Sequence, residues 1–143
     1  MGHNTTNEIR IRLYDRLIKK NAFIPVIIDP LSAVSKRSMV DSGSVILGYS
    51  FLNTDSRIGE NCIINTNAII EHDVVIGNHV HISTGAILNG NVFVGANCFV
   101  GSGAIIKNGI TICPNTIIGA GSVVLKDIFE SAVYVGIPAK KLY

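Results

Sequence analysis

The sequence predicts an all-β protein, a parallel β-helix of hexapeptide repeats preceded by a short helix and strand. Three observations predict this fold. An aliphatic residue occupies every sixth position from Val34 to Val124, without an insertion. Asn, Asp or Gly stands three residues after most of these positions, and a small residue often stands four residues after them. A fixed short period of this kind indicates a solenoid of stacked coils.

The aliphatic column predicts the core, because each repeat turns one of these side chains inward. The column consists of Val34, Val40, Ile46, Leu52, Ile58, Ile64, Ile70, Ile76, Ile82, Leu88, Val94, Val100, Ile106, Ile112, Ile118 and Val124.

The Asn, Asp and Gly column predicts a turn in every repeat, because these residues tolerate a positive φ. Three repeats then make one coil of a triangular prism, and residues eighteen apart stack at about 4.8 Å. The predicted turn residues are Gly43, Asp55, Asn61, Asn67, Asp73, Gly85, Asn91, Asn97, Gly103, Gly109, Asn115, Gly121 and Asp127. The small residues suit tight inner corners and include Cys62 and Cys98, which we interpret as packing residues.

Two faces of the predicted prism carry apolar side chains on the outside. Such stripes predict self-association, since monomers rarely leave large apolar patches in water. One stripe is Phe51, Ile69, Ile87 and Ile105, and the other is Val45, Ile63, Phe99 and Ile117.

The segments at the two ends depart from the repeat, so we divide the chain into residues 1–30, 31–129 and 130–143. Thr5-x-x-Glu8 is a capping-box pattern that opens a predicted helix, and FIPVIID, residues 23–29, reads as a strand. The helix has Ile9, Leu13 and Leu17 on one side, with Tyr14 and Ile18 beside them.

Composition excludes several classes of protein. The chain is 48% hydrophobic and 15% charged, which argues against disorder, and a net charge of +2 gives no sign of a nucleic-acid partner. The basic cluster of Arg10, Arg12, Arg16, Lys19 and Lys20 reads as a solvated helix face. The three cysteines lack CxxC spacing, which favours a reducing cytoplasm. We expect neither a signal peptide nor a membrane span.

The repeats IGENCI, IGNHVH, VGANCF and IGAGSV resemble those of the hexapeptide-repeat acyltransferase superfamily. This resemblance implies left-handed coils and a homotrimer. The segment from Ile64 to Gly90 and the ending Val135-Gly-Ile-Pro-Ala-Lys140 are similar to the sialic acid O-acetyltransferase and bacillosamine N-acetyltransferase family. Gly2-His3-Asn4 sits where that family has a Gly-Asp-Asn-like turn. Residues 1–30 then correspond to the tail of the family's sugar-binding domain, most of which is missing.

The resemblance implies that His72 is the general base, with Asp73 holding its imidazole. The residues support this role, because His72 falls at a turn and histidine exchanges protons near neutral pH. Gly90 lies eighteen residues further on and should stack beneath His72, where its N–H would face an acetyl thioester.

The resemblance also implies contacts to CoA and to the acceptor. For acetyl-CoA we expect Gly90 together with Ser102, Ala120, Gly136, Pro138 and Lys140. For the acceptor we expect His81, reached across a subunit boundary, and Glu71. His79 reads as a solvated turn residue, and no metal is expected.

The function expected is direct acetyl transfer from acetyl-CoA to an amine or hydroxyl of a sugar or nucleotide sugar of bacterial surface glycans. Two alternatives remain open at this point: a trimeric scaffold or inactive remnant, and a zinc enzyme similar to γ-class carbonic anhydrase.

Overall fold

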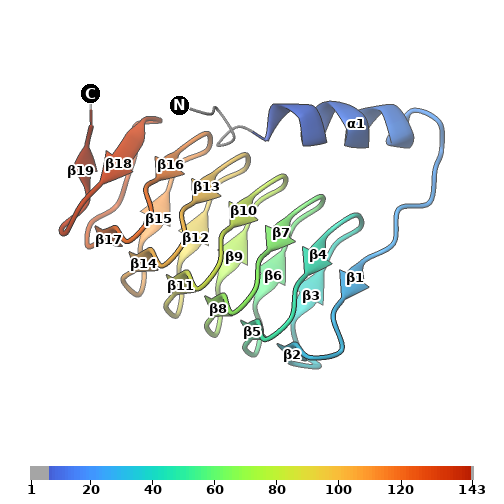
Figure 1. The fold of residues 1–143 in the computed structure, drawn as a ribbon, viewed down its shortest axis with the longest axis horizontal. Coiled ribbons are helices and arrows are strands. Elements are labelled where there is room, and N and C mark those ends of the chain that lie inside the picture. The colour runs from blue at the N-terminus through green and yellow to red at the C-terminus, as the bar shows by residue number, and fades with distance from the viewer. Residues whose placement is uncertain (1–6, 143) are drawn as a thin grey trace.

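The computed structural model describes residues 7–142 and has the predicted architecture, a stack of parallel coils with the shape of a prism (Figure 1). The solenoid strands are two residues long, and each pairs in parallel with the strands one coil before and after it. No helix within residues 7–142 has the length and apolarity needed to cross a membrane.

The strands form three sheets, which we call A, B and C. Sheet A contains β1 (Ile27–Ile28), β4 (Val45–Ile46), β7 (Ile63–Ile64), β10 (His81–Ile82), β13 (Phe99–Val100), β16 (Ile117–Ile118), β18 (Val133–Val135) and β19 (Lys140–Lys141). Sheet B contains β2 (Ala33–Val34), β5 (Phe51–Leu52), β8 (Ile69–Ile70), β11 (Ile87–Leu88), β14 (Ile105–Ile106) and β17 (Val123–Val124). Sheet C contains β3 (Met39–Val40), β6 (Arg57–Ile58), β9 (Val75–Ile76), β12 (Phe93–Val94) and β15 (Thr111–Ile112).

The second residue of each two-residue solenoid strand belongs to the aliphatic column and points into the core. From Ile46 to Val124 every member of the column is buried, while Val34 and Val40 in the first coil are half-buried. The first residue of each strand faces outward, so the predicted stripes run along sheets B and A. The predicted period therefore identifies both the core and the outer faces.

The predicted turn residues adopt a positive φ, with the exception of Asp127. Asp127 differs because the chain leaves the solenoid there, and its side chain accepts a hydrogen bond from the Thr111 N–H at 2.7 Å. Tyr49 and His79 occupy the same turn position and also have positive φ, at 61° and 63°. Stacking of the coils overrides the ordinary preference of these two residues.

The small residues after the turns are buried at the inner corners, as predicted. Cys62 and Cys98 are free thiols at these corners, and burial raises the pKa of each to about 11. Both cysteines are thus packing residues rather than reactive thiols.

The N-terminal appendage differs from the prediction in two details. The helix α1 (Glu8–Ile18) follows Asn7, whose side chain makes no capping hydrogen bond, and Thr5 lies outside the described residues. Of the strand predicted over residues 23–29, only β1 forms. Pro25 has no N–H to donate, and the side chain of Phe23 is 90% exposed, so this stretch does not extend sheet A.

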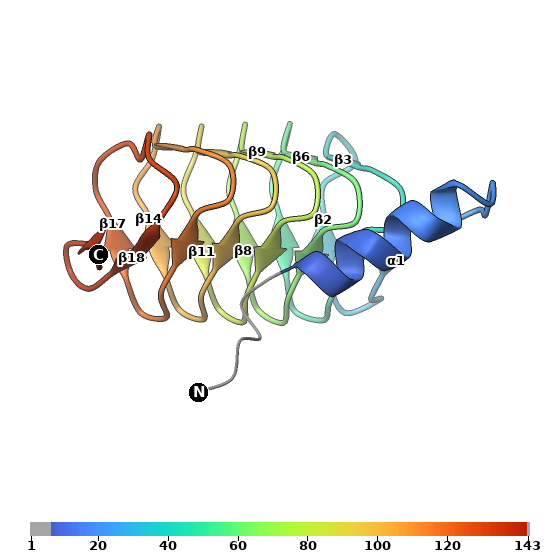
Figure 2. The same cartoon turned by 90° about the horizontal axis from the view of Figure 1, so that it is seen from above.

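α1 lies along one edge of the prism, beside the turns that lead from sheet C to sheet A (Figure 2). We call this the C–A edge. Tyr14 is buried there and shares a hydrogen bond of 2.9 Å with the Ser42 hydroxyl. Asn7 donates to the Cys98 carbonyl at 3.2 Å, and Arg10 donates to the His79 carbonyl at 2.9 Å. Arg10 is therefore an anchor of the helix, whereas the other basic residues of the cluster are exposed as predicted.

His79 is half-buried beneath α1, so its assignment as a solvated turn residue is wrong. Its ring contacts Tyr14 edge-on with centroids 5.7 Å apart, and its Nδ1 accepts from the Asn61 amide at 2.9 Å. Burial, followed by the nearby Arg10 cation, lowers the pKa of His79, against the opposing effect of Asp15 and Glu60. The docked helix thus favours a neutral imidazole.

Acidification is expected to loosen α1 through His79. The pKa of His79 is lower when α1 is docked than when it is undocked. The docked state is therefore fully stable above pH 6.5, about the ordinary histidine pKa, and loses stability as the pH falls below that value. Amide hydrogen exchange of Glu8–Ile18 between about pH 7.5 and 5 should show increasing opening in the wild type. His79→Asn keeps a residue that tolerates positive φ but does not titrate, so its helix should show a flatter dependence; equal slopes would contradict this role.

Candidate functional site

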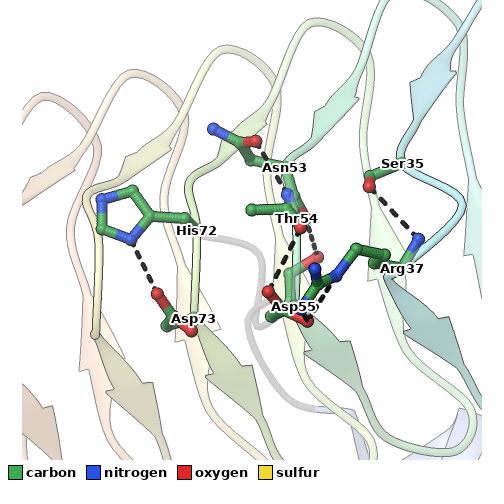
Figure 3. A network of polar contacts seen from close by, with 8 residues as sticks. Ser35, Arg37, Asn53, Thr54, Asp55, His72 and Asp73 are labelled. Carbon is green, nitrogen blue, oxygen red and sulfur yellow. Dashed lines mark hydrogen bonds and ion pairs between the residues drawn. The ribbon is translucent and has the colours of Figure 1, made fainter.

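His72 lies on the edge of the prism where sheet B turns into sheet C, which we call the B–C edge. The edge consists of stacked turns, including Asn53–Asp55, Glu71–Asp73 and Asn89–Asn91, which connect strands that pair eighteen residues apart. Because Ile70 points inward, the turn residues that follow it project away from the core. Figure 3 shows His72 and Asp73 on this edge, beside the turn of the preceding coil.

The side chains of His72 and Asp73 form a pair. The Nδ1 of His72 donates to Oδ2 of Asp73 at 2.8 Å, and both side chains are about half exposed. This bond orients the ring and leaves Nε2 with a free lone pair. The arrangement is that of a histidine base held by a carboxylate.

Gly90 lies directly against the His72 ring, as the eighteen-residue spacing predicts. A Cβ added at Gly90 would lie 2.5 Å from both Cε1 and Nε2 of His72. The ring therefore leans toward the C-terminal side of its own coil. The N–H of Gly90 makes no hydrogen bond within the described residues, so it is a free donor next to the imidazole.

Glu71 is half-buried and is held by a residue that sequence reasoning missed. The Asn53 amide, one coil earlier, donates to Oε2 of Glu71 at 2.7 Å, while its own Oδ1 accepts from the Thr54 N–H at 2.7 Å. The eighteen-residue spacing between Asn53 and Glu71 was a signal that could have indicated this pair. Asp55, the acidic residue of the turn Asn53–Asp55, forms an ion pair with Arg37 at 3.0 Å (Figure 3).

Ser102 and Ala120 lie on a different edge, where sheet A turns into sheet B. We call this the A–B edge; both residues are exposed there and stack on adjacent coils, with the Gly121 N–H donating to the Ser102 carbonyl at 2.9 Å. Within one chain, sheet B separates them from His72 and Gly90. The structure therefore does not bring these predicted CoA contacts together with His72 in a single chain.

The three C-terminal candidates lie at the end of the prism. Gly136 donates to the Ser122 hydroxyl at 3.0 Å, and its carbonyl accepts from the Val123 N–H. Pro138 and Lys140 line a cavity of about 310 Å³ together with Lys126 and Tyr134. This cavity adjoins the last coil of sheet B.

His81 faces outward from sheet A, on the other side of the prism from His72, as predicted. Its ring packs edge-on against Phe99 with centroids 5.1 Å apart. Burial, then the Arg10 cation, lowers the pKa of His81. It lines a groove of about 400 Å³ between sheet A and α1, whose residues Ile9, Leu13 and Leu17 are largely exposed.

Residues 7–142 contain no group of three or more His, Cys, Asp or Glu side chains arranged to hold a metal ion.

Substitution of Gly90 by alanine should displace the His72 ring rather than unfold the chain. The clash is with the far end of a half-exposed side chain, which can rotate away, so the free energy of unfolding should fall by less than about 1 kcal/mol. The imidazole NMR signals of His72 should lose the signature of the Asp73 hydrogen bond. In a His72→Ala background the added methyl group meets no ring, and stability should then be unchanged; an undisturbed His72 signal in Gly90→Ala would show that the ring does not rest on this glycine.

Comparison with known proteins identifies the family and the fold of the chain. The bacterial transferase hexapeptide (six repeats) family matches residues 55–90 and 91–126. No curated protein sequence matches the chain significantly. The acetyltransferase domain of PglB from Neisseria gonorrhoeae, solved alone and with acetyl coenzyme A, is 32% identical with a TM-score of 0.94. That match covers 96% of this chain and 67% of the PglB domain.

Two further solved structures are similar. PerB from Caulobacter crescentus, in complex with CoA and GDP-perosamine, is 34% identical with a TM-score of 0.93, over 96% of this chain and 66% of PerB. WeeI from Acinetobacter baumannii is 26% identical with a TM-score of 0.91, over 96% of this chain and 68% of WeeI. The chain thus spans about two thirds of each relative. These matches confirm the left-handed β-helix and the resemblance to sugar acetyltransferases, and the chain belongs to the bacterial transferase hexapeptide family.

Proposed function

We propose that the chain is an acetyltransferase that moves the acetyl group of acetyl-CoA to a sugar or nucleotide sugar of bacterial surface glycans. The observation that carries the proposal is the His72 imidazole, oriented by Asp73 and resting on Gly90. A proton acceptor and a free N–H donor next to each other are the two groups that acyl transfer requires.

In this reaction Nε2 of His72 takes the proton of the attacking group as it adds to the thioester carbon. The N–H of Gly90 stabilises the negative charge that develops on the acetyl oxygen. The carbon–sulfur bond then breaks, and His72 passes the proton to the departing CoA sulfur. Asp73 is a positioning residue that stabilises the imidazolium.

The similar proteins support the donor and the class of acceptor. The PglB domain was solved with acetyl coenzyme A, and PerB with CoA and GDP-perosamine. For this chain we assign Gly90, Ser102, Ala120, Gly136, Pro138 and Lys140 to CoA and His81 and Glu71 to the acceptor. The cations Lys126 and Lys140 at the C-terminal cavity suit the phosphates of CoA.

The arrangement of the edges supports a homotrimer. The base lies on the B–C edge, whereas Ser102, Ala120 and His81 lie on the A–B edge or sheet A, so a complete site needs a second chain. The outer residues of sheets A and B are predominantly apolar. Sheet C also presents Met39, Val75 and Phe93, but Arg57 and Thr111 interrupt its apolar surface. We therefore propose that sheets A and B of neighbouring subunits face each other and leave sheet C in solvent.

We also propose the division into an N-terminal helix–strand segment (1–30), the β-helix (31–129) and a CoA-end tail (130–143). The free thiols of Cys62, Cys98 and Cys113 suit a reducing cytoplasm, where acetyl-CoA is available.

Loss of the base should remove most of the activity. His72→Ala should lower the rate of CoA thiol release from acetyl-CoA, with a panel of amino and neutral nucleotide sugars, by about 100-fold or more. Asp73→Asn keeps a turn-forming residue and should cause a smaller loss. His79→Asn is the matched histidine control on the C–A edge and should retain wild-type rates at pH 7.5. Equal rates in wild type and His72→Ala would exclude His72 as the base, and no thiol release with any acceptor would favour a scaffold.

Charge placed on the apolar face of sheet B should dissociate the trimer. Wild type is expected to have a mass in light scattering of three times the 15.3 kDa chain. Ile105→Lys should shift it to the monomer, because a lysine at the centre of an apolar interface loses its hydration. Thr111→Lys, at the outward position of sheet C, is the matched control and should stay trimeric. A wild-type monomer, or dissociation only in Thr111→Lys, would contradict the proposed faces.

A further inference from the structure

We propose that His81 contacts the acceptor as a neutral hydrogen-bond donor through its Nδ1–H, and that Asn65 is the positioning residue that fixes this tautomer. The inference rests on the proposed function, in which His72 is the base and His81 lies at the acceptor. It gives the two histidines different tasks. His72 takes a proton, whereas His81 keeps its proton and orients the sugar.

The first step concerns the orientation of the Asn65 side chain, in the turn that follows β7. Its Oδ1 accepts from the Thr66 N–H at 2.7 Å, so Nδ2, at the other end of the amide, is turned toward a different group. Nδ2 makes a long hydrogen bond of 3.5 Å with Nε2 of His81. Asn53 and Thr54 make the same local contact at 2.7 Å in another turn. The backbone of the Asn-Thr turn therefore sets the direction of the amide.

The second step concerns the proton on the His81 ring. An amide NH2 group can only donate, so the ring nitrogen that faces it must offer a lone pair. Nε2 of His81 is therefore unprotonated in the neutral ring, and the proton lies on Nδ1. Nδ1 makes no hydrogen bond within residues 7–142. His81 thus has a donor that is left for a ligand.

The third step concerns the charge of the ring. His81 is half-buried on the outer face of sheet A and packs edge-on against Phe99. Burial, and then the Arg10 cation, lowers the pKa of His81, so the neutral form dominates at pH 7.5. None of the described residues that line the groove of about 400 Å³ is acidic, so no carboxylate there favours the imidazolium. The groove therefore holds a neutral donor.

The fourth step compares the two histidines of the proposed site. His72 gives its Nδ1–H to Asp73 and leaves Nε2 as a free lone pair. His81 has the reverse arrangement, because its Nε2 faces an amide donor and its Nδ1–H is left free. Two titratable groups in opposed surroundings indicate a division of roles between them. His72 is suited to accept a proton, and His81 is suited to donate a hydrogen bond.

The ligand atom that suits His81 is an oxygen with a lone pair. A sugar offers such oxygens in its hydroxyl groups and its ring, and a nucleotide sugar adds those of its phosphates. Because the proton of His81 stays on Nδ1 throughout, His81 takes no part in making or breaking bonds. Its contribution is to the binding of the acceptor, which should appear in KM rather than in kcat.

The tautomer can be measured by ¹⁵N NMR of the full chain with labelled histidine at pH 7.5. The His81 signals are identified by their loss in His81→Gln. In wild type Nδ1 should carry the proton, and Nε2 should show the shift of an unprotonated nitrogen. Asn65→Asp keeps the oxygen that accepts from the Thr66 N–H but turns an oxygen toward Nε2. A proton should therefore appear on Nε2 of His81 in this variant.

Asn67→Asp is the matched control, because it adds the same charge at a nearby turn position with a positive φ of 59°. Asp55 and Asp73 occupy the equivalent position of other turns, so the turn should form as before. The His81 signals of this control should equal those of wild type. A proton on Nε2 in wild type would overturn the assignment of Asn65, as would an unchanged tautomer in Asn65→Asp or the same change in Asn67→Asp.

The acceptor role is tested by thiol release with the panel of nucleotide sugars, GDP-perosamine among them. His81→Ala and Asn65→Asp should each raise KM for the acceptor by about 3- to 10-fold, the effect of one lost hydrogen bond, while kcat and KM for acetyl-CoA change little. His81→Gln, whose amide can also donate, should recover part of the loss. Asn67→Asp should keep the wild-type KM.

A loss of kcat in His81→Ala comparable with that in His72→Ala would show that His81 moves a proton, which contradicts the inference. An unchanged acceptor KM in His81→Ala would show that His81 does not contact the acceptor. No turnover of any acceptor by wild type would instead remove the proposed function, and the acceptor role with it, whereas the NMR result would still decide whether Asn65 fixes the tautomer.

Discussion

The parallel backbone ladder between residues eighteen apart is the constraint on which the rest of the structure depends. Strands of two residues bury little on their own, and each coil is held by the hydrogen bonds it exchanges with the coils on either side. Because the ladder continues without an insertion, a side chain in one turn always stacks on the same position of the next. The contact between His72 and Gly90 follows from this register.

The register also explains how much could be predicted from the sequence. Position along the repeat determines the aliphatic column, the turn residues and the His72–Gly90 pair, and this position can be read from the amino-acid sequence. Two features depend on something else. Pro25 limits the strand predicted over residues 23–29, and His79 is covered by α1, a contact that no period describes. The Asn53–Glu71 pair obeys the eighteen-residue register, but its bond also depends on the orientation of the Asn53 amide, which the Thr54 N–H determines.

The chemical groups are distributed over the edges of the prism rather than gathered in one pocket. His72 and several acidic residues lie on the B–C edge, the small residues proposed to bind CoA lie on the A–B edge, and His81 lies beside α1 on sheet A. A single chain thus presents two halves of a site on different faces. This separation makes association of copies a requirement of the proposed chemistry, and the apolar outer side chains of sheets A and B suit such association.

The uninterrupted repeat also fixes distances along the prism axis. Lys126 stands on the same edge as His72, three coils further on, so the C-terminal cavity begins about 14 Å from the base. Loss or gain of one whole coil would preserve every turn and every inward side chain, yet would change that span by about 4.8 Å. In the proposed reaction, the number of coils therefore sets the length of the donor that can reach from these lysines to the His72 imidazole, independently of the residues between them.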